Sequence, residues 1–190
     1  MFEDKIIHYP DFPKEGIDFI DVLPLLQNKA TFTEICNQFS KLTTCPNIAT
    51  VEARGFLFAA PLLVTAPHVQ TIIPFRKKGK LPYSEGDLQS ICIAKEYGND
   101  EVFFRISDVA SCVPDGDTIY ISLFDDLLAT GGTALGIANA LNRLTVTKNG
   151  KTYQVKIKEF LFITELPDLH GADVLSPIAP VHSIMKIAGV

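Results

Sequence analysis

The sequence predicts an α/β fold in which a mostly parallel central sheet is flanked by helices. Short, continuously apolar runs alternate along the chain with segments whose apolar residues recur at helical spacing. This alternation is typical of parallel strands that helices cover on both faces. The length of 190 residues fits one domain spanning 1–190.

The first half of the chain contains several predicted elements. Apolar residues at positions i, i+3, i+4 and i+7 predict a helix over 31–42. Thr31 and Glu34 form a possible capping box at its start. The run NIATV predicts a short buried strand at 47–51, and TIIPF predicts another at 71–75.

Further elements follow these strands. FLFAAPLLV predicts a buried helix over 56–64, which Pro61 shortens or bends. Residues 76–90 are polar and contain two glycines and a proline, so they predict a long loop of the kind that is often functional. Two strands, 91–97 and 101–106, are expected around the turn GND.

The second half repeats the alternation. TIYISLF is rich in β-branched and aromatic residues and predicts a strand at 118–124. An Asn-Gly pair within 145–158 predicts a hairpin with a type I′ turn, and EFLFIT predicts a last core strand at 159–164. A helix is expected after the glycines of the TGGT motif, with one apolar face formed by Ala134, Ile137, Ala138, Leu141 and Leu144.

Composition and charge limit the kinds of partner. The net charge is −5, whereas general nucleic-acid binders are usually basic, so no nucleic-acid partner is expected. Positive charge gathers in FRKKGK at 75–80, which suits a small anion. No apolar run approaches the roughly 18 residues of a membrane span, so no membrane partner is expected. Four scattered cysteines and no recognisable secretory signal favour a cytoplasmic location.

The stretch FDDLLATGGTA at 124–134 predicts a phosphate site. Gly131 and Gly132 fall between a predicted strand and a predicted helix, where the backbone can approach an anion closely. Asp125 and Asp126 precede them at the strand end. Because carboxylates repel phosphate, we expect their partners to be sugar hydroxyls or hydrated Mg²⁺. The spacing suits a ribose 5-phosphate; the alternative is a strand-to-helix turn with two solvated acids.

Two basic segments also suit an anion. In EARG at 52–55, Arg54 follows a strand and precedes a helix, so it can bind a diphosphate through two parallel hydrogen bonds. The alternative is an exposed arginine at a helix start. The run FRKKGK at 75–80 is either part of an anion site or a solvated charged turn.

Several segments together resemble one enzyme family. ISLFDDLLATGGT at 121–133 resembles the phosphoribosyl-pyrophosphate signature of type I phosphoribosyltransferases. The segments YPDFPKEGIDFIDVLPLL, EARGFLFAAPL, FRKKGKLP and EYGND resemble those of adenine phosphoribosyltransferases, in the same order. The resemblance covers roughly residues 9–187. The signature alone would indicate only the wider superfamily, whereas the ordered set is specific.

The resemblance implies the type I phosphoribosyltransferase fold, with a small N-terminal hood at about 1–30 and a flexible catalytic loop at about 76–98. An insertion is expected at about 145–156, where the family's connection is usually shorter. The implied function is purine salvage, in which adenine and 5-phosphoribosyl-1-pyrophosphate give AMP and pyrophosphate. A homodimer is expected. Mg²⁺ is the expected cofactor, held mainly by substrate and water near Asp125 and Asp126, with no direct protein ligand.

The resemblance also implies a role for individual residues. Glu96 is expected near N7 of the purine, where it shares the ring proton, and Tyr97 is expected over the reacting centre. The alternative for Glu96 is a solvated glutamate. Arg54 completes the catalytic set. The residues expected to bind the phosphoribosyl group are Asp125, Asp126, Ala129, Thr130, Gly131, Gly132 and Thr133. Those expected to bind pyrophosphate, partly across a dimer interface, are Ala53, Arg54, Gly55, Arg76, Lys77 and Lys80.

For the base, Phe19 and Leu166 are expected to cover the two faces of adenine, with the backbone around Asp18 and Ile20 reading its 6-amino edge. The family often has arginine where Ile20 stands. Enzymes for 6-oxopurines usually carry an acid where Ala129 stands, which favours adenine. The alternatives are a transferase for hypoxanthine, guanine or orotate, and a non-catalytic regulator that senses the activated sugar.

Overall fold

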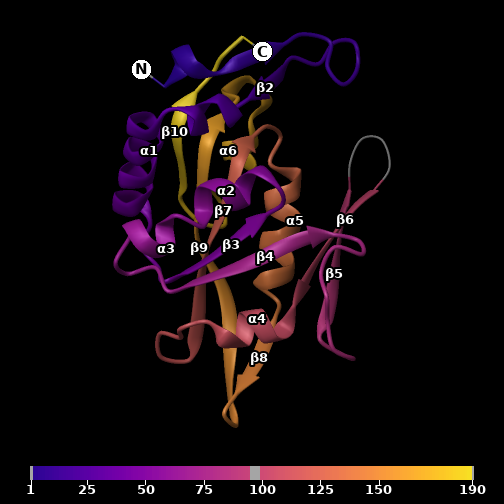
Figure 1. Ribbon diagram of the computed structural model, residues 1–190. Helices are drawn as coiled ribbons and strands as arrows, with labels where there is room; N and C mark the ends of the chain where they lie inside the picture. Colours follow the sequence, from indigo (N-terminus) through magenta and orange to yellow (C-terminus); the bar gives the residue numbers. More distant parts are fainter. Residues whose placement is uncertain (1, 95–98, 190) are drawn as a thin grey trace.

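The computed structural model describes residues 2–94 and 99–189. Its main sheet has the strand order β10-β9-β7-β3-β4-β6-β5, and β8 pairs with β9 (Figure 1). Neighbours from β10 to β4 are parallel, whereas β6 is antiparallel to β4 and β5. The predicted α/β fold with a mostly parallel sheet is confirmed. The strands are β3 (Asn47–Val51), β4 (Thr71–Lys77), β5 (Leu88–Ala94), β6 (Asn99–Arg105), β7 (Thr118–Leu128), β8 (Thr145–Lys148), β9 (Lys151–Glu165) and β10 (Val181–Lys186).

Helices cover both faces of this sheet. Side chains alternate along each strand, so Ile48 joins one apolar core and Ala49 joins the other. On the face of Ile48 lie α1 (Lys29–Leu42), α2 (Arg54–Ala59) and α3 (Leu62–Thr65). On the face of Ala49 lie α4 (Ile106–Ser111), α5 (Gly132–Leu141) and α6 (Gly171–Leu175).

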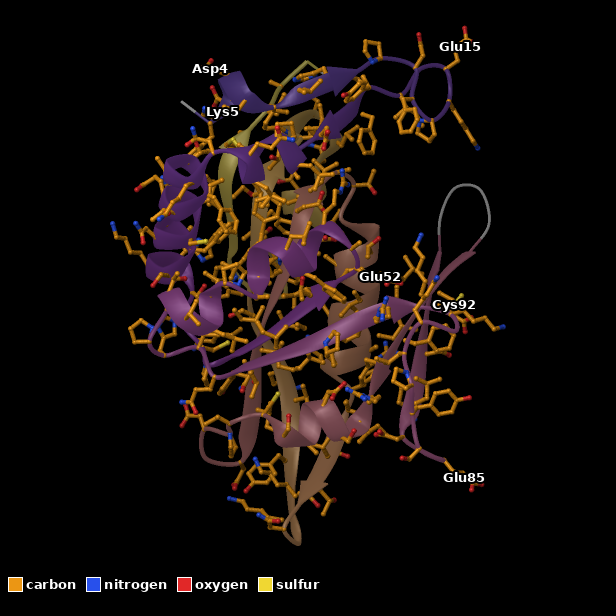
Figure 2. All side chains as sticks on the ribbon, viewed as in Figure 1. Asp4, Lys5, Glu15, Glu52, Glu85 and Cys92 are labelled. Carbon is orange, nitrogen blue, oxygen red and sulfur yellow. The ribbon has the colours of Figure 1, made fainter. Side chains whose placement is uncertain are left out.

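The N-terminal segment lies at the end of the molecule where both termini lie (Figure 1). It contains the 3-10 helices η1 (Glu3–Lys5) and η2 (Leu23–Gln27) and an antiparallel pair, β1 (Ile7–Tyr9) and β2 (Phe19–Asp21). Glu15 lies at the tip of the loop between these strands (Figure 2). Ile20 and Leu25 are buried in the core beneath α1. Sequence periodicity did not predict these short elements.

Several boundaries from the sequence are confirmed and others are wrong. The strand at 47–51 is confirmed as β3. The predicted helix over 56–64 is broken into α2 and α3, as Pro61 suggested, because Pro61 caps α3. Its complete burial is wrong, since one face stays exposed through Leu57, Leu63 and Val64.

The start of α1 also differs from the prediction. The capping box at Thr31 is wrong, because the side chain of Asn28 caps the helix and accepts a hydrogen bond from Thr31 N at 3.0 Å. Thr31 therefore lies inside the first turn. The predicted loop over 76–90 is too long at both ends, because β4 continues to Lys77 and β5 starts at Leu88.

The central strand β7 is longer than predicted. It runs to Leu128, so Asp125 and Asp126 lie within the strand and their predicted place at its end is wrong. The reason is pairing with β9, which continues to Glu165, whereas pairing with β3 ends at Phe124. On the β3 side the two acids therefore lie beyond the last paired residue.

The remaining elements of the second half are placed as follows. The antiparallel pairing of β5 with β6 confirms the expected hairpin. The turn predicted at GND is wrong, because Asn99 and Asp100 lie within β6 and pair with Ala94 and Ile93. The buried face of α5 is confirmed at Ala134, Ile137, Ala138 and Leu141, but its extension to Leu144 is wrong, because the helix ends at Leu141. Asn149 and Gly150 both have positive φ, which confirms the type I′ turn between β8 and β9. Strand β10 was not predicted. Within 2–94 and 99–189, no helix is long and apolar enough to cross a membrane.

Candidate active site

Residues 129–133 join the end of β7 to the start of α5 and form a small cradle. Gly131 is the N-cap of α5 with φ +79, a conformation that favours glycine. The first N–H groups of α5 have no partner within the helix, so they can bind an anion. The cradle encloses a cavity of about 100 Å³ lined by Asp125, Leu127, Leu128, Ala129, Thr130, Gly131, Gly132, Thr133, Ala134 and Phe162.

A second glycine supports the cradle from behind. A Cβ on Gly171 would lie 2.1 Å from the carbonyl oxygen of Ala129 and 3.0 Å from Gly131 N. A Cβ on Gly131 would in turn lie 3.0 Å from Gly171 O. The two segments therefore approach as closely as they do because neither residue has a side chain. Leu166 N also donates to Leu128 O at 2.8 Å, which ties the same segment to the end of β7.

The paired acids differ in their surroundings. Burial, and then the neighbouring charge of Asp126, raise the pKa of Asp125 well above its ordinary value, although Arg54 opposes the shift. Asp125 Oδ1 accepts a hydrogen bond from Asp126 N at 2.9 Å. A Cβ on Gly55 would lie 2.6 Å from Thr50 Oγ1, so α2 can approach Thr50 on β3 because residue 55 is glycine; Asp125 Oδ1 would lie 3.4 Å away, at ordinary contact distance.

Arg54 links the acids to the N-terminal segment. Its Nε lies 2.8 Å from Asp126 Oδ2 in an ion pair, and its guanidinium carbon lies 5.0 Å from the ring centroid of Phe19. Its Nη1 donates to Ile20 O at 3.4 Å. One side chain at the start of α2 therefore contacts both β7 and β2.

A second cavity, of about 270 Å³, lies between the N-terminal segment and the sheet. It is lined by Gly16, Ile17, Asp18, Phe19, Ile20, Leu127, Ala129, Leu166 and Leu169. All four residues expected at the base are among them. Leu127 and Ala129 also line the cradle cavity, so the two cavities adjoin.

Asp18 and Ile20 have distinct surroundings in this second cavity. Asp18 Oδ2 lies 2.7 Å from His8 Nδ1, and its buried Oδ1 has no hydrogen-bond partner within the part of the chain that the structure describes. Ile20 is only 1% exposed and packs into the core beneath α1. Its side chain therefore stabilises the N-terminal segment, while its backbone stays at the cavity.

The basic turn after β4 is joined to the EARG segment by Glu52. Arg76 Nε donates to Glu52 Oε2 at 2.9 Å, and Lys77 N donates to Glu52 Oε1. Arg76 Nη1 also donates to Lys80 O at 2.7 Å. Lys77 and Lys80 are exposed and line neither cavity.

Comparisons with known proteins identify relatives of this chain. No protein-family model matches it. The adenine phosphoribosyltransferase of Ruminiclostridium cellulolyticum is 37% identical over 192 residues, which cover 97% of this chain and 98% of the relative. The adenine phosphoribosyltransferase of Nitrosopumilus maritimus is 36% identical, and the match covers 91% of this chain and 92% of the relative. The chain belongs to the adenine phosphoribosyltransferase family.

Solved structures agree with this membership. The adenine phosphoribosyltransferase of Thermoanaerobacter pseudethanolicus superimposes with a TM-score of 0.77 at 33% identity, covering 98% of this chain and 100% of that one. The Saccharomyces cerevisiae enzyme, complexed with an imino-altritol bisphosphate and adenine, gives a TM-score of 0.73 at 30% identity, covering 96% of each chain. The expected type I phosphoribosyltransferase fold is confirmed.

Two residues of the catalytic set expected for this family cannot be placed. Glu96 and Tyr97 lie outside the described residues, so their roles stay predictions. Arg54, the third, contacts Asp126 on β7 and the ring of Phe19 on β2. No group of three or more His, Cys, Asp or Glu side chains that could hold a metal ion occurs within the described ranges.

The sequence did not single out several residues of this adenine phosphoribosyltransferase-family site. Leu127 lies between the acids and the glycines of the signature, and its spacing could have indicated a wall of the cavity. Glu52 belongs to the quoted EARG segment, but its partners on β4 are distant in sequence. Leu169 and Gly171 follow β9, and no local pattern indicates that they meet the cradle.

Proposed function

We propose that this chain is a purine salvage enzyme that makes AMP and pyrophosphate from adenine and 5-phosphoribosyl-1-pyrophosphate. The observation that carries the proposal is the pair of adjoining cavities. One is a small glycine cradle at a helix N-terminus, and the other is a larger apolar cavity beside it. A nucleoside monophosphate has the matching parts, a phosphate and a planar base joined by a ribose.

The cradle at 129–133 binds the 5′-phosphate through backbone N–H groups and the hydroxyls of Thr130 and Thr133. Asp125 and Asp126, which stand beside the cradle, accept hydrogen bonds from the ribose hydroxyls. Support for this division comes from charge, because two carboxylates repel a phosphate but suit hydroxyl donors.

Arg54 exchanges partners during the reaction. In the structure it is paired with Asp126, and the proposal assigns it, with Ala53 and Gly55, to pyrophosphate. When Arg54 turns to the diphosphate, Asp126 becomes free to accept from the ribose. Lys77 and Lys80 supply further positive charge to the leaving group. Pyrophosphate binding and ribose binding are thereby coupled through one side chain.

The base occupies the larger cavity, with Phe19 on one face and Leu166 on the other. In the reaction the bond from C1 of the sugar to pyrophosphate breaks, the N9–C1 bond forms, and the purine gives up one proton. Glu96 is assigned to hold that proton at N7, and Tyr97 covers the reacting centre. Because positive charge develops on the sugar, preorganised charges contribute more than a protein nucleophile.

Mg²⁺ fits this site as a companion of the substrate. The oxygens that it prefers are available from Asp125 and Asp126, but one of these acids is paired with Arg54 and the other has a raised pKa. The residues therefore suit outer contacts through water, with the diphosphate as the main ligand. When bound, the ion neutralises charge on the leaving diphosphate.

The protein is proposed to act as a cytoplasmic homodimer. The exposed apolar side chains Leu57, Leu63 and Val64 lie on α2 and α3, next to the EARG segment, and they support an interface there. Light scattering coupled to gel filtration tests the assembly, because a dimer has twice the mass of the 20.9 kDa chain.

The function is tested by pyrophosphate release from Mg²⁺ and 5-phosphoribosyl-1-pyrophosphate, with adenine, hypoxanthine, guanine or no base added. Release with adenine alone, matched by AMP, is the expected result. Release with a 6-oxopurine would keep the reaction and change the base. No release with any base, together with retained binding of the activated sugar, would instead support a sensing regulator.

A further inference from the structure

Glu52 lies where the two proposed pyrophosphate segments meet. It follows β3 and immediately precedes Ala53 and Arg54, and Figure 2 shows it on the connection from β3 to α2. Its N–H donates to Phe75 O at 3.0 Å. Its carboxylate accepts from Arg76 and from Lys77 N, so both oxygens are bound to the end of β4.

Arg76 extends this contact into the basic turn. Its Nε is bound to Glu52, while its Nη1 donates to Lys80 O at 2.7 Å. Lys80 N donates back to Lys77 O at 3.1 Å, and Gly79 has φ +72, which closes the turn. One guanidinium therefore fixes both the strand end and the far side of the turn.

The cluster combines one negative charge, on Glu52, with the positive charges of Arg76, Lys77 and Lys80. Burial alone would raise the pKa of Glu52, but hydrogen bonds from Lys77 N and Arg76, with the positive charges of Arg76 and Lys80, lower it below its ordinary value. Glu52 is thus ionised at neutral pH and neutralises Arg76. The exposed ammonium groups of Lys77 and Lys80 keep the turn positive.

We propose that Glu52 is a positioning residue for pyrophosphate, which holds the 76–80 turn beside residues 53–55 so that the two segments form one anion site. This inference rests on the proposed function. It also changes the role of Arg76, which acts through Glu52 and Lys80 O instead of binding pyrophosphate independently. Lys77 and Lys80 then remain as the side chains of the turn that face the anion.

The proposal predicts that removing the carboxylate of Glu52 weakens anion binding. If Glu52 only contributed negative charge, Glu52→Gln would strengthen anion binding. As a positioning residue, its replacement weakens binding, because glutamine offers one oxygen to two donors and its NH₂ faces either Arg76 or Lys77 N, which loses its hydrogen bond. Glu52→Asp keeps the charge but shortens the side chain, so it cannot reach both partners and is expected to weaken binding as well.

The test is a calorimetric titration of magnesium pyrophosphate into the full-length protein, which requires no turnover. We expect Glu52→Gln and Arg76→Gln each to weaken binding about tenfold, as for loss of one charge-assisted hydrogen bond. The double variant should bind magnesium pyrophosphate no more weakly than the weaker-binding single variant, because both changes break the same contact between Glu52 and Arg76. Lys78→Gln is the matched control, because it removes one charge from the same turn and should leave binding within about twofold.

Steady-state kinetics and thermal unfolding complete the design. The KM for 5-phosphoribosyl-1-pyrophosphate should rise with the pyrophosphate Kd, while the KM for adenine stays within about twofold; a partial loss of folding would instead lower kcat and the unfolding temperature and leave both KM values unchanged. The proposal is overturned if Glu52→Gln binds pyrophosphate as tightly as wild type or more tightly. It is also overturned if the increase in Kd for the double variant equals the product of the increases for the two single variants. A wild-type protein that binds pyrophosphate but makes no AMP contradicts the proposed function alone.

Discussion

Gly171→Ala should damage the phosphate cradle although residue 171 is assigned no contact with substrate. The added Cβ would lie 2.1 Å from Ala129 O, whereas ordinary contact begins at 3.4 Å, so one segment must move by about 1.3 Å. A displacement of about 1 Å in a positioning group can cost roughly 100-fold in rate. We therefore expect kcat/KM for 5-phosphoribosyl-1-pyrophosphate to fall roughly 100-fold, with a loss of about 1–3 kcal/mol in the free energy of unfolding from overpacking.

The assay is initial-rate AMP formation with the activated sugar varied, together with urea unfolding. Gly116→Ala is the control, because Gly116 has φ +59, its added Cβ meets nothing within 4 Å, and it lies before β7, far along the strand from the cradle. It should lose about 1 kcal/mol of stability from backbone strain and keep wild-type kinetics. If Gly171→Ala keeps kcat/KM within about twofold of wild type, the cradle does not depend on this close approach.

Three further predictions concern the acids and the base. Asp125→Asn should lower activity but raise stability at neutral pH. Because the folded-state pKa of Asp125 is raised, wild type loses stability as pH climbs above the ordinary value of about 4, so urea unfolding should show the variant more stable than wild type at pH 7 and this advantage lost near pH 4. Leu166→Ala should raise the KM for adenine about tenfold, since one apolar face of the base is lost, and an unchanged KM would place the base elsewhere. Glu96→Gln should reduce turnover roughly 100-fold or more while AMP binding, measured by calorimetry, changes little; equal kinetics would remove Glu96 from the mechanism.

Local patterns predicted the interior of the sheet well. Strand 47–51 and the turn at Asn149 and Gly150 were predicted correctly because each depends on nearby residues, a continuous apolar run and a pair that tolerates positive φ. The hood was expected from the family resemblance, but its short strands and β10 were not predicted from periodicity. These strands have three to six residues, too few for a period to emerge, and β10 is stabilised by pairing with β9.

The sequence predicted which residues form the site better than it predicted which of them contact one another. The signature placed the acids next to the glycines; in the structure Asp125 lines the cradle cavity, whereas Asp126 lines neither cavity and is paired with Arg54. The end of β7 depended on β9, so the acids lie inside the strand. The partners of Arg54 and Arg76 could not be read from spacing, because Asp126 and Glu52 are brought to them by parallel strands that are distant in sequence. Gly171 meets the cradle through tertiary packing alone.

The departure at Ile20 shows how one substitution can affect packing without removing a backbone contact. Its side chain is buried in the core beneath α1, whereas its carbonyl oxygen accepts from Arg54 Nη1. An arginine at this position would have to leave that core, because a buried unpaired charge is costly. The N-terminal segment of this chain is therefore stabilised by apolar packing at residue 20.

The most direct measurement is a crystal structure of the protein with AMP bound. The account predicts the phosphate on residues 129–133, the ribose hydroxyls at Asp125 and Asp126, and the purine between Phe19 and Leu166. A purine bound away from Leu166, for example in the third cavity, which is lined by Tyr9, Phe12, Phe19 and Asp21, would contradict the assignment of the two adjoining cavities to one nucleotide.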